Sequence, residues 1–350
     1  MCIRNLLNGG FIVVVKHILC MSGRYNIENL LKILREPVYI RAAFAEMWND
    51  LRKLTRKKAE SLLYSNQYTD TETDIIDKDY DNLLILDACR YDYLTKIYDG
   101  DGQKVTSVAG NSANFIQKSM NGKELHDTVY ISSNPYTDMT LNEGVFHRVI
   151  KTYDGTWKKG AYNDHTKYHP ENVFNIAKSH IEKFNDKRII VHFMQPHGPY
   201  FGEKAKEIRK KLMSEENISF TRLEDGPSNP DKTYPDLMHA ASYGYLSSED
   251  VQTVYEENLK MVLNYALQLQ KLLEGKTVIS ADHGENLGNP STYFSADYGH
   301  GGYSPEVREV PWVELEYETR KNVRRARPVK SNEVDKEVVI EQLESLGYME

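Results

Sequence analysis

Four short apolar runs, each ending abruptly in polar and reactive residues, constrain the fold of this chain most strongly. They are Asn82–Leu86 before Asp87, Thr128–Ile131 before Ser132–Pro135, Arg188–Met194 before Gln195–Gly198, and Lys276–Ser280 before Ala281–Glu285. Val310–Val313 is a weaker fifth run. Nearly continuous apolar runs are typical of strands that are buried on both faces of a parallel sheet. The sequence therefore predicts a buried central sheet.

Helix-like segments lie between these runs. Glu171–Phe184 precedes the third run and Ser248–Leu273 precedes the fourth. Alternation of strands and helices predicts an α/β fold with a central, mainly parallel sheet flanked by helices. Ligands of such sheets bind beyond the carboxyl ends of the strands, where Asp and His residues stand in this sequence.

The chain is predicted to have three parts. Residues 1–80 are expected to form a helical extension, in which residues 1–20 are either native or a mis-assigned start upstream of Met21. Residues 81–320 are expected to form a catalytic-type domain with an insertion at 203–245 that resembles a lid, and residues 321–350 a basic tail and a closing helix.

Composition excludes several classes of protein. The 44 basic and 51 acidic residues give a net charge of −7, which argues against a nucleic-acid partner. The three cysteines (Cys2, Cys20 and Cys89) cannot build a disulfide framework, so a cytoplasmic location is expected. The apolar run Phe11–Val15 is too short to span a bilayer. The basic face of a helix predicted over Leu30–Ser61 leaves peripheral membrane contact open, and oligomeric state is not predicted.

A metal site is predicted from Asp282 and His283, which follow a buried run directly. A carboxylate and an imidazole side by side suit Zn²⁺ or Mn²⁺. Asp87 ends another run and by itself would be read as the N-cap of a helix over Ala88–Lys96. Considered together with Asp282 and His283, Asp87 is better interpreted as a third metal ligand. Glu285 could brace this cluster.

Ser112 lies in a loop of small residues, Thr106–Phe115, at the predicted start of a helix. Free backbone N–H groups and the helix dipole at such a position can hold a phosphate or sulfate. A metal beside the hydroxyl would make it a nucleophile. Taken alone, Ser112 is more often a simple N-cap. Asn111 could cap equally well, or donate to an anionic substrate oxygen.

Two histidines and one arginine complete the candidate site. His197 lies in a turn fixed by two prolines and a glycine, and could orient an ester oxygen or act as an acid. His300 lies between glycines, close enough in sequence to His283 to fold back over the site. Arg90 is a candidate anion contact, although such a residue is more often a surface charge.

In this order, these motifs resemble the alkaline phosphatase superfamily, and more narrowly the sulfatase-like proteins of archaea. The segment Asp282–Gly288, followed by His300, also looks like phosphoethanolamine transferases of the same superfamily. The resemblance covers roughly two thirds of the chain, Asn82–Glu314 and the tail around Leu346–Tyr348.

The resemblance implies a metal-dependent hydrolase of phosphate or sulfate esters. Asp87, Asp282 and His283 would be metal ligands, with Ser112 as nucleophile and fourth ligand. His197 and His300 would contact the ester. One divalent metal ion is expected, with Zn²⁺ or Mn²⁺ favoured and Ca²⁺ as an option, and a second metal is left open. The substrate would be a small-molecule, glycan-linked or lipid-linked ester.

The sequence departs from the sulfatase pattern because it has no Cys-x-Pro-x-Arg motif, and Cys89 is interpreted as a packing residue. This absence favours phosphate over sulfate chemistry. Two alternatives stay open. One is a transferase of the phosphoethanolamine or phosphoglycerol type that modifies surface glycans or lipids. The other is a non-catalytic scaffold with the superfamily fold.

Overall fold

The computed structural model describes residues 70–153, 165–220, 230, 232–289 and 298–329, together with scattered positions between 55 and 68. The chain divides into two units, Met1–Lys58 and Ala59–Glu350, and almost all of the described residues belong to the second unit. The predictions for residues 1–20 and for the closing helix lie outside the described residues, as does nearly all of the helix predicted over Leu30–Ser61.

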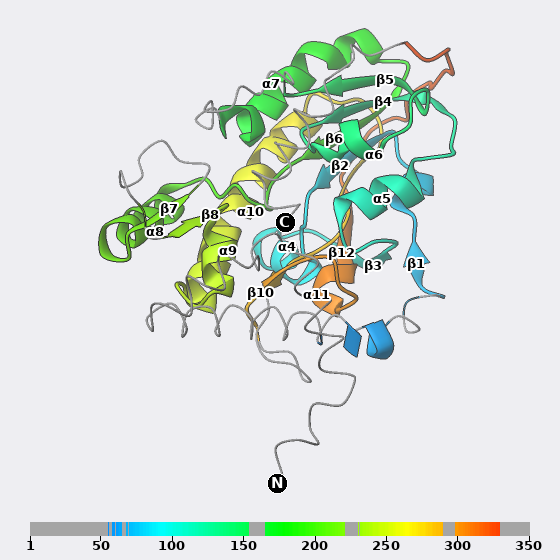
Figure 1. Ribbon diagram of the computed structural model, residues 1–350. Helices are drawn as coiled ribbons and strands as arrows, with labels where there is room; N and C mark the ends of the chain where they lie inside the picture. The colour runs from blue at the N-terminus through cyan, green and yellow to red at the C-terminus, as the bar shows by residue number, and fades with distance from the viewer. Residues whose placement is uncertain are drawn as a thin grey trace. The chain divides into compact units, whose positions relative to one another are not determined.

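An eight-stranded sheet forms the centre of the second unit (Figure 1). In spatial order its strands are β1 (Glu72–Thr73), β3 (Gln103–Ser107), β12 (Glu309–Glu314), β9 (Thr277–Ser280), β2 (Asn82–Leu86), β6 (Arg188–Phe193), β4 (Leu125–Ser132) and β5 (Phe146–Lys151). All neighbours are parallel except β12, which is antiparallel to both β3 and β9. The predicted mainly parallel sheet is confirmed, and all five apolar runs are strands.

The sequence did not predict β1, β3 or β5. Only one residue of each strand is buried, Ser107 in β3 and Phe146 in β5, so these strands show no continuous apolar run. Glu72–Thr73 pairs with β3, and Ile75 and Ile76 are buried in the core. Residues ahead of the predicted domain start at 81 thus contribute a strand and core side chains to this unit.

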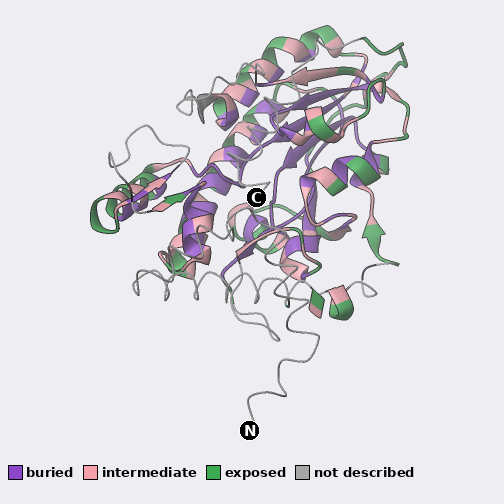
Figure 2. Ribbon diagram, viewed as in Figure 1, coloured by how far each residue is buried: buried purple, intermediate pink, exposed green. Residues whose placement is uncertain are grey.

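Helices cover both faces of the sheet. Alternate side chains of β2 point to opposite faces: Leu84 and Leu86 pack in the core cluster that includes Leu259 of α10, whereas Leu83 and Ile85 pack with Phe115 of α5. The first face carries α4 (Tyr91–Ile97), α7 (Pro170–Ile181) and α10 (Ser248–Gln270), and the second carries α5 (Ser112–Ser119) and α6 (Tyr136–Thr140). Figure 2 shows that the central strands and the inner side of α10 are buried.

The predicted insertion at 203–245 has secondary structure of its own. It contains α8 (Glu203–Glu215), β7 (Ile218–Phe220), β8 (Lys232–Tyr234) and α9 (Leu237–Ser242). Leu212 and Leu237 join the same core cluster as α10, so the insertion is packed onto the domain. The remaining elements are η2 (Ile75–Asp77), η3 (His165–Tyr168), η4 (Glu182–Phe184), β10 (Asn286–Leu287), β11 (Tyr298–Gly299) and α11 (Pro305–Arg308).

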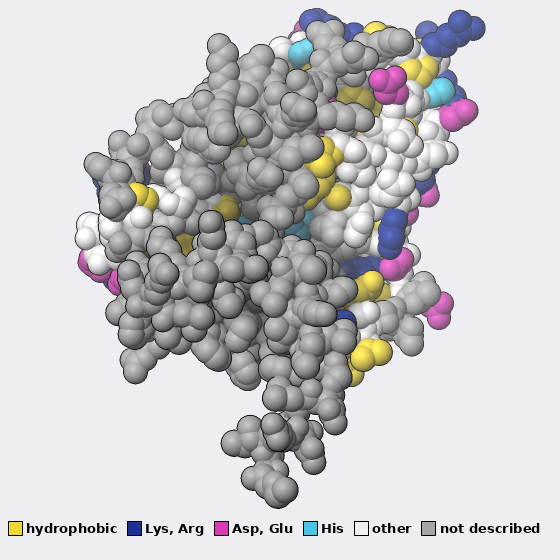
Figure 3. Space-filling view, viewed as in Figure 1, with side chains coloured by type: hydrophobic (Ala, Val, Ile, Leu, Met, Phe, Trp, Pro, Cys, Tyr) yellow, Lys and Arg dark blue, Asp and Glu magenta, His cyan; other side chains and the backbone are white. Residues whose placement is uncertain are grey.

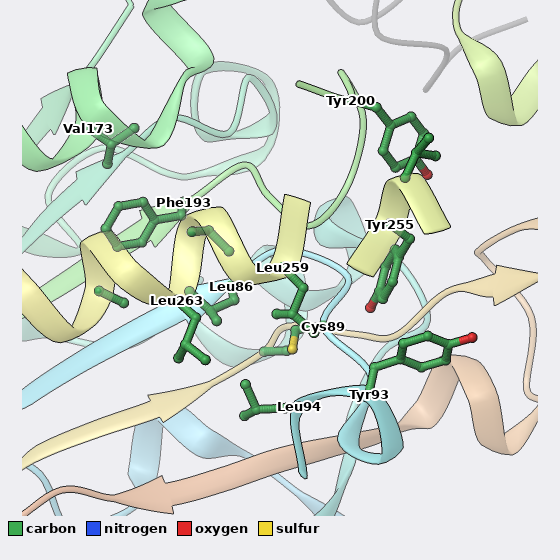
Figure 4. Close-up of a cluster of buried hydrophobic side chains, with 14 of the residues drawn as sticks. Leu86, Cys89, Tyr93, Leu94, Val173, Phe193, Tyr200, Tyr255, Leu259 and Leu263 are labelled. Atoms are coloured by element: carbon green, nitrogen blue, oxygen red, sulfur yellow. The ribbon is translucent and has the colours of Figure 1, made fainter. Parts of the chain in front are cut away.

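Cys89 is a free, fully buried thiol. Its sulfur lies among Leu86, Leu94, Leu259 and Leu263 in the core next to α10 (Figure 4). The interpretation of this cysteine as a packing residue is confirmed. In the part of the chain that the structure describes, no helix combines the length and the apolar character needed to cross a membrane.

The basic tail crosses the amino ends of β2, β6, β4 and β5. Backbone N–H groups of Arg324, Ala326 and Val329 donate to the carbonyl oxygens of Asp186, His126 and His147. Lys and Arg side chains gather near β5, where this segment passes (Figure 3). Residues 320–329 are therefore tied to the sheet on the edge opposite the predicted site.

Asp81 fixes the start of this tail. Its buried carboxylate accepts hydrogen bonds from Arg320 Nε at 2.7 Å, from the backbone N–H of Lys276 at 2.8 Å and from that of Lys321 at 3.2 Å. Burial acts to raise the pKa of Asp81, but these donors outweigh it and hold the pKa below its ordinary value. This stabilisation is present above the unfolded-state pKa of about 4 and is lost as the pH falls through the folded-state value.

Asp81→Asn is expected to lower the free energy of unfolding by about 2–4 kcal/mol at pH 7, because the Arg320 guanidinium loses its buried partner. Denaturant unfolding at several pH values measures this, and the difference from wild type should shrink below about pH 4. Asp79→Asn is the matched control: Asp79 also binds Arg320, but its side chain is 63% exposed. It should cost less than about 1 kcal/mol. Equal losses in the two variants would contradict this account.

Candidate active site

The predicted ligands meet at the carboxyl ends of two neighbouring strands. Asp87 follows β2, and Asp282 and His283 follow the adjacent parallel strand β9. Ser112 begins α5 beside them. One ligand atom from each of Asp87, Asp282 and His283 lies within 4.8 Å of the other two, and all three side chains are fully buried. The structure thus brings together the ligand set that the sequence predicted.

Each of the two carboxylates has one oxygen held by protein donors and one bare oxygen. Asp87 Oδ2 accepts from Ser112 Oγ at 3.1 Å and from Asn134 Nδ2 at 2.6 Å. Asp282 Oδ1 accepts from the backbone N–H groups of Ala88 and His283. Asp87 Oδ1 and Asp282 Oδ2 accept no hydrogen bond from any described residue.

Both bare oxygens face His283 Nε2, which lies 3.5 Å from Asp87 Oδ1 and 3.6 Å from Asp282 Oδ2. His283 Nδ1 lies 2.8 Å from the carbonyl oxygen of Gly284, so we assign the ring proton to Nδ1. Nε2 then presents a lone pair to two carboxylate oxygens. Three buried acceptors facing one another repel unless a proton or a cation lies between them. The donor set, two carboxylates and an imidazole, suits Zn²⁺ or Mn²⁺.

Charge repulsion within the site is visible in its pKa values. Burial and the neighbouring Asp282 carboxylate raise the pKa of Asp87 well above its ordinary value. Burial also acts to raise the pKa of Asp282, but His283 and His192 outweigh it and leave the pKa lowered. Burial lowers the pKa of His283. Without a cation, the two carboxylates therefore share one proton, which a bound metal would displace.

Ser112 contributes its hydroxyl to this cluster and does not act as the helix cap. The cap is Asn111, whose side chain accepts from the backbone N–H of Asn114. Ser112 Oγ lies 3.1 Å from Asp87 Oδ2 and 3.3 Å from His283 Nε2. The hydroxyl therefore lies within hydrogen-bond distance of two of the three candidate metal ligands.

The residue after Asp87 is held in an unusual conformation. Ala88 has a φ of 60°, in the left-handed region that costs a non-glycine residue on the order of 1–2 kcal/mol. Its N–H donates to Asp282, and Tyr255 Oη donates to its carbonyl oxygen. Helix α4 begins at Tyr91, with Arg90 as its N-cap. Asp87 is thus not the helix cap considered from the sequence, because the turn at Ala88 aims it at the metal ligands.

Gly284 permits the sharp turn after His283. A Cβ atom at Gly284 would lie 2.1 Å from the carbonyl oxygen of Glu306, so no other residue fits without moving that backbone. The N–H of Gly284 also donates to the carbonyl oxygen of Val307 at 2.7 Å. This close approach ties the loop after β9 to the segment that leads into β12.

A second polar group lies beside the first. His197, Glu285 and His300 bring one ligand atom each within 4.8 Å of one another. His300 Nδ1 lies 2.9 Å from Glu285 Oε1, and the His300 ring is 4.6 Å from that of His283, measured between centroids. Burial lowers the pKa of His197 to about 4, so this imidazole is neutral at pH 7. Glu285 thus belongs to the second group, which could hold another cation or the oxygens of an ester.

Arg90 is engaged by the protein in this structure. Its guanidinium makes two hydrogen bonds to Asp92 and one to the carbonyl oxygen of Glu285. Its side chain is 7% exposed. The role of Arg90 as an anion contact stays a prediction, and the observed bonds brace the loop that carries Glu285.

Two residues of the site were not predicted. Asn134 follows β4, and its Nδ2 donates to Asp87 Oδ2. The sequence could have indicated this residue, because Asn134 belongs to the polar segment that ends the second apolar run. His192 lies within β6, with Nε2 3.7 Å from Asp87 Oδ2 and 3.6 Å from Asp282 Oδ2. Its only signal was a histidine inside an otherwise apolar run.

No protein-family model matches this sequence, and no curated protein matches it. Solved structures do show similarity. One is the C-terminal periplasmic domain of a phosphoethanolamine transferase from Campylobacter jejuni, with 16% identity, a TM-score of 0.41, and coverage of 67% of this chain and 78% of that one. Another is the soluble domain of lipooligosaccharide phosphoethanolamine transferase A from Neisseria meningitidis, with 14% identity, a TM-score of 0.37, and coverage of 67% and 75%.

A third similar structure is described as a protein in the alkaline phosphatase superfamily, from Vibrio parahaemolyticus. It has 10% identity, a TM-score of 0.33, and coverage of 69% of this chain and 60% of that one. Proteins of the alkaline phosphatase superfamily are what this chain is similar to. The narrower resemblance to archaeal sulfatase-like proteins stays a prediction.

Proposed function

We propose that this protein is a metal-dependent enzyme that cleaves phosphate or sulfate esters through a covalent intermediate on Ser112. The observation that carries the proposal is the convergence of a serine hydroxyl, two bare carboxylate oxygens and one imidazole nitrogen in a buried cluster. A non-catalytic scaffold has no need for a hydroxyl aimed at buried acceptors that repel one another.

The residues of the chain would perform the reaction as follows. Attack forms a bond from Ser112 Oγ to phosphorus or sulfur and breaks the bond from that atom to the leaving oxygen. The hydroxyl proton would pass from Oγ to Asp87 Oδ2, the oxygen that accepts its hydrogen bond. Asp87, Ser112, Asp282 and His283 would hold a divalent cation, whose positive charge would lower the pKa of the hydroxyl and stabilise the transferred group.

The second group supports binding of the ester. His197 and His300 lie next to the metal ligands, with ring centroids 5.1 Å apart, and Glu285 fixes the orientation of His300. Neutral His197 donates its one ring N–H, at Nδ1, to the carbonyl oxygen of Gly198, so its Nε2 can only accept. His300, paired with the Glu285 carboxylate, would be the donor: its Nε2–H would bind a non-bridging oxygen of the ester and give a proton to the leaving oxygen. Water, or an alcohol in a transferase, then attacks the ester of Ser112 and releases the enzyme.

The absence of a Cys-x-Pro-x-Arg motif in the sequence favours phosphate over sulfate as the transferred group. The substrate we infer is a small-molecule, glycan-linked or lipid-linked phosphate ester. We also propose a cytoplasmic location, which rests on cysteine usage alone.

A metal-dependent ester assay tests the proposal. Chelator-treated full-length protein would be assayed on 4-nitrophenyl phosphate, bis(4-nitrophenyl) phosphate and 4-nitrophenyl sulfate, with Zn²⁺, Mn²⁺ or Ca²⁺ restored. We expect nitrophenol release to depend on added metal and to be faster from a phosphate ester. Added ethanolamine or glycerol would appear as a phosphorylated product if an alcohol is the natural acceptor. Protein that binds no metal and releases no nitrophenol above the Ser112→Ala background would instead support the scaffold hypothesis.

A further inference from the structure

His192 is a buried histidine that the proposed reaction does not use. It lies in the middle of the sheet, in β6, opposite Ile85 of β2. Its ring is fully buried. Nδ1 lies 2.8 Å from Tyr130 Oη on the neighbouring strand β4, and Nε2 has no hydrogen-bond partner among the described residues. A buried ring nitrogen without a partner is costly and calls for an explanation.

The direction of Nε2 supplies that explanation. It faces one oxygen of each metal-binding carboxylate, at 3.6 Å from Asp282 Oδ2 and 3.7 Å from Asp87 Oδ2. A lone pair on Nε2 would repel both oxygens, whereas an N–H would attract both. We therefore assign the proton to Nε2, which makes Nδ1 the acceptor of the Tyr130 hydroxyl.

His192 is not placed as a further metal ligand. The atoms that lie within 4.8 Å of one another are those of Asp87, Asp282 and His283. For Asp87, His192 approaches Oδ2, the oxygen that also accepts from Asn134, rather than the bare Oδ1. For Asp87, this leaves the opposite oxygen to the cation. For Asp282, His192 faces the bare Oδ2 itself, which has two lone pairs and can accept from Nε2–H while binding a cation.

We propose that His192 is a positioning residue, oriented by Tyr130, whose Nε2–H holds Asp87 and Asp282 in the geometry that binds the metal. The proposal rests on the metal site of the proposed function. At 3.6 and 3.7 Å, Nε2–H lies just beyond hydrogen-bond distance of the two carboxylates and attracts both electrostatically. Groups that hold metal-binding carboxylates in this way typically contribute about 10–100-fold to metal affinity.

The test is metal affinity rather than activity. Full-length wild type, His192→Phe, His192→Gln and Tyr130→Phe would be freed of metal with a chelator and titrated with Zn²⁺ or Mn²⁺ by calorimetry. His192→Phe keeps a ring in the cavity but has no N–H, and should bind metal about 10–100-fold more weakly. His192→Gln restores a side-chain N–H donor and should recover most of that affinity. Tyr130→Phe, which loses only the orienting hydroxyl, should lie between wild type and His192→Phe.

His126→Phe is the control, because His126 lies at the amino end of β4, away from the site. It should bind metal as wild type does. Wild-type affinity in both His192→Phe and Tyr130→Phe would overturn the proposal, as would a failure of His192→Gln to exceed His192→Phe. If His192→Phe does not fold, the metal affinity of Tyr130→Phe relative to wild type tests the proposal, and equal affinities would overturn it. Absence of metal binding by wild type would instead overturn the proposed function itself.

Discussion

Ser112→Ala is expected to lower ester cleavage by at least about 1,000-fold, the largest effect we expect from any single substitution. The hydroxyl lies 3.1 Å from Asp87 Oδ2 and 3.3 Å from His283 Nε2, so its removal takes away both the nucleophile and one metal ligand. The substitution leaves the helix cap at Asn111 intact, because the cap bond comes from the Asn111 side chain. Turnover of 4-nitrophenyl phosphate with saturating metal measures the effect.

Ser119→Ala is the matched control for this experiment. Ser119 ends the same helix, is equally buried, and has an Oγ without a hydrogen-bond partner among the described residues. Its replacement should leave turnover within about twofold of wild type. If Ser112→Ala retained more than about a tenth of wild-type turnover, Ser112 would not be the nucleophile.

Asp282→Asn is expected to abolish the stabilisation that metal gives to the wild-type protein. At a free metal concentration of about 100 times Kd, a bound ion stabilises the folded state by about 2.7 kcal/mol, which raises the Tm of a domain of this size by at least about 5 °C. The variant loses the bare oxygen Oδ2, so its Tm should change by less than about 1 °C on metal addition. Thermal scans of chelator-treated protein, with and without Zn²⁺ or Mn²⁺, measure both values.

The Tm of metal-free Asp282→Asn provides a second test, because here the variant is expected to be at least as stable as wild type. Asp87 and Asp282 repel each other across the buried cluster, and this repulsion helps to raise the pKa of Asp87. Removal of one charge should therefore leave the metal-free Tm of Asp282→Asn equal to that of metal-free wild type or above it. Asp127→Asn, at the amino end of β4, is the control and should respond to metal normally. A full metal response in Asp282→Asn would show that the ion binds elsewhere.

The sequence predicted the central sheet and the carboxylates at its strand ends for one physical reason. A strand buried on both faces must be apolar throughout, so its end is marked where the first polar residue appears. Asp87 and Asp282 stand at such ends, and the structure places them on neighbouring strands. The same signal is absent from β3 and β5, which have one buried residue each, and these strands were not predicted.

The sequence could not predict which groups donate hydrogen bonds to the site. His192 looked like one more residue of a buried strand, and only the pairing of β6 with both β2 and β4 brings it between Tyr130 and the two carboxylates. Glu285 was expected to brace the metal ligands, but the loop that returns from β11 pairs it with His300.

What the sequence determined by itself is therefore the inventory: a mainly parallel α/β sheet, strand ends that carry Asp87 and the Asp282–His283 pair, and a serine at the start of a helix. What only the tertiary structure decided is which hydrogen-bond partners these groups have. It leaves one oxygen of each carboxylate bare and turns Ala88 so that Asp87 faces the site. Strand ends are marked locally by a change in polarity, whereas the partner of each oxygen depends on strand order, which no local pattern encodes.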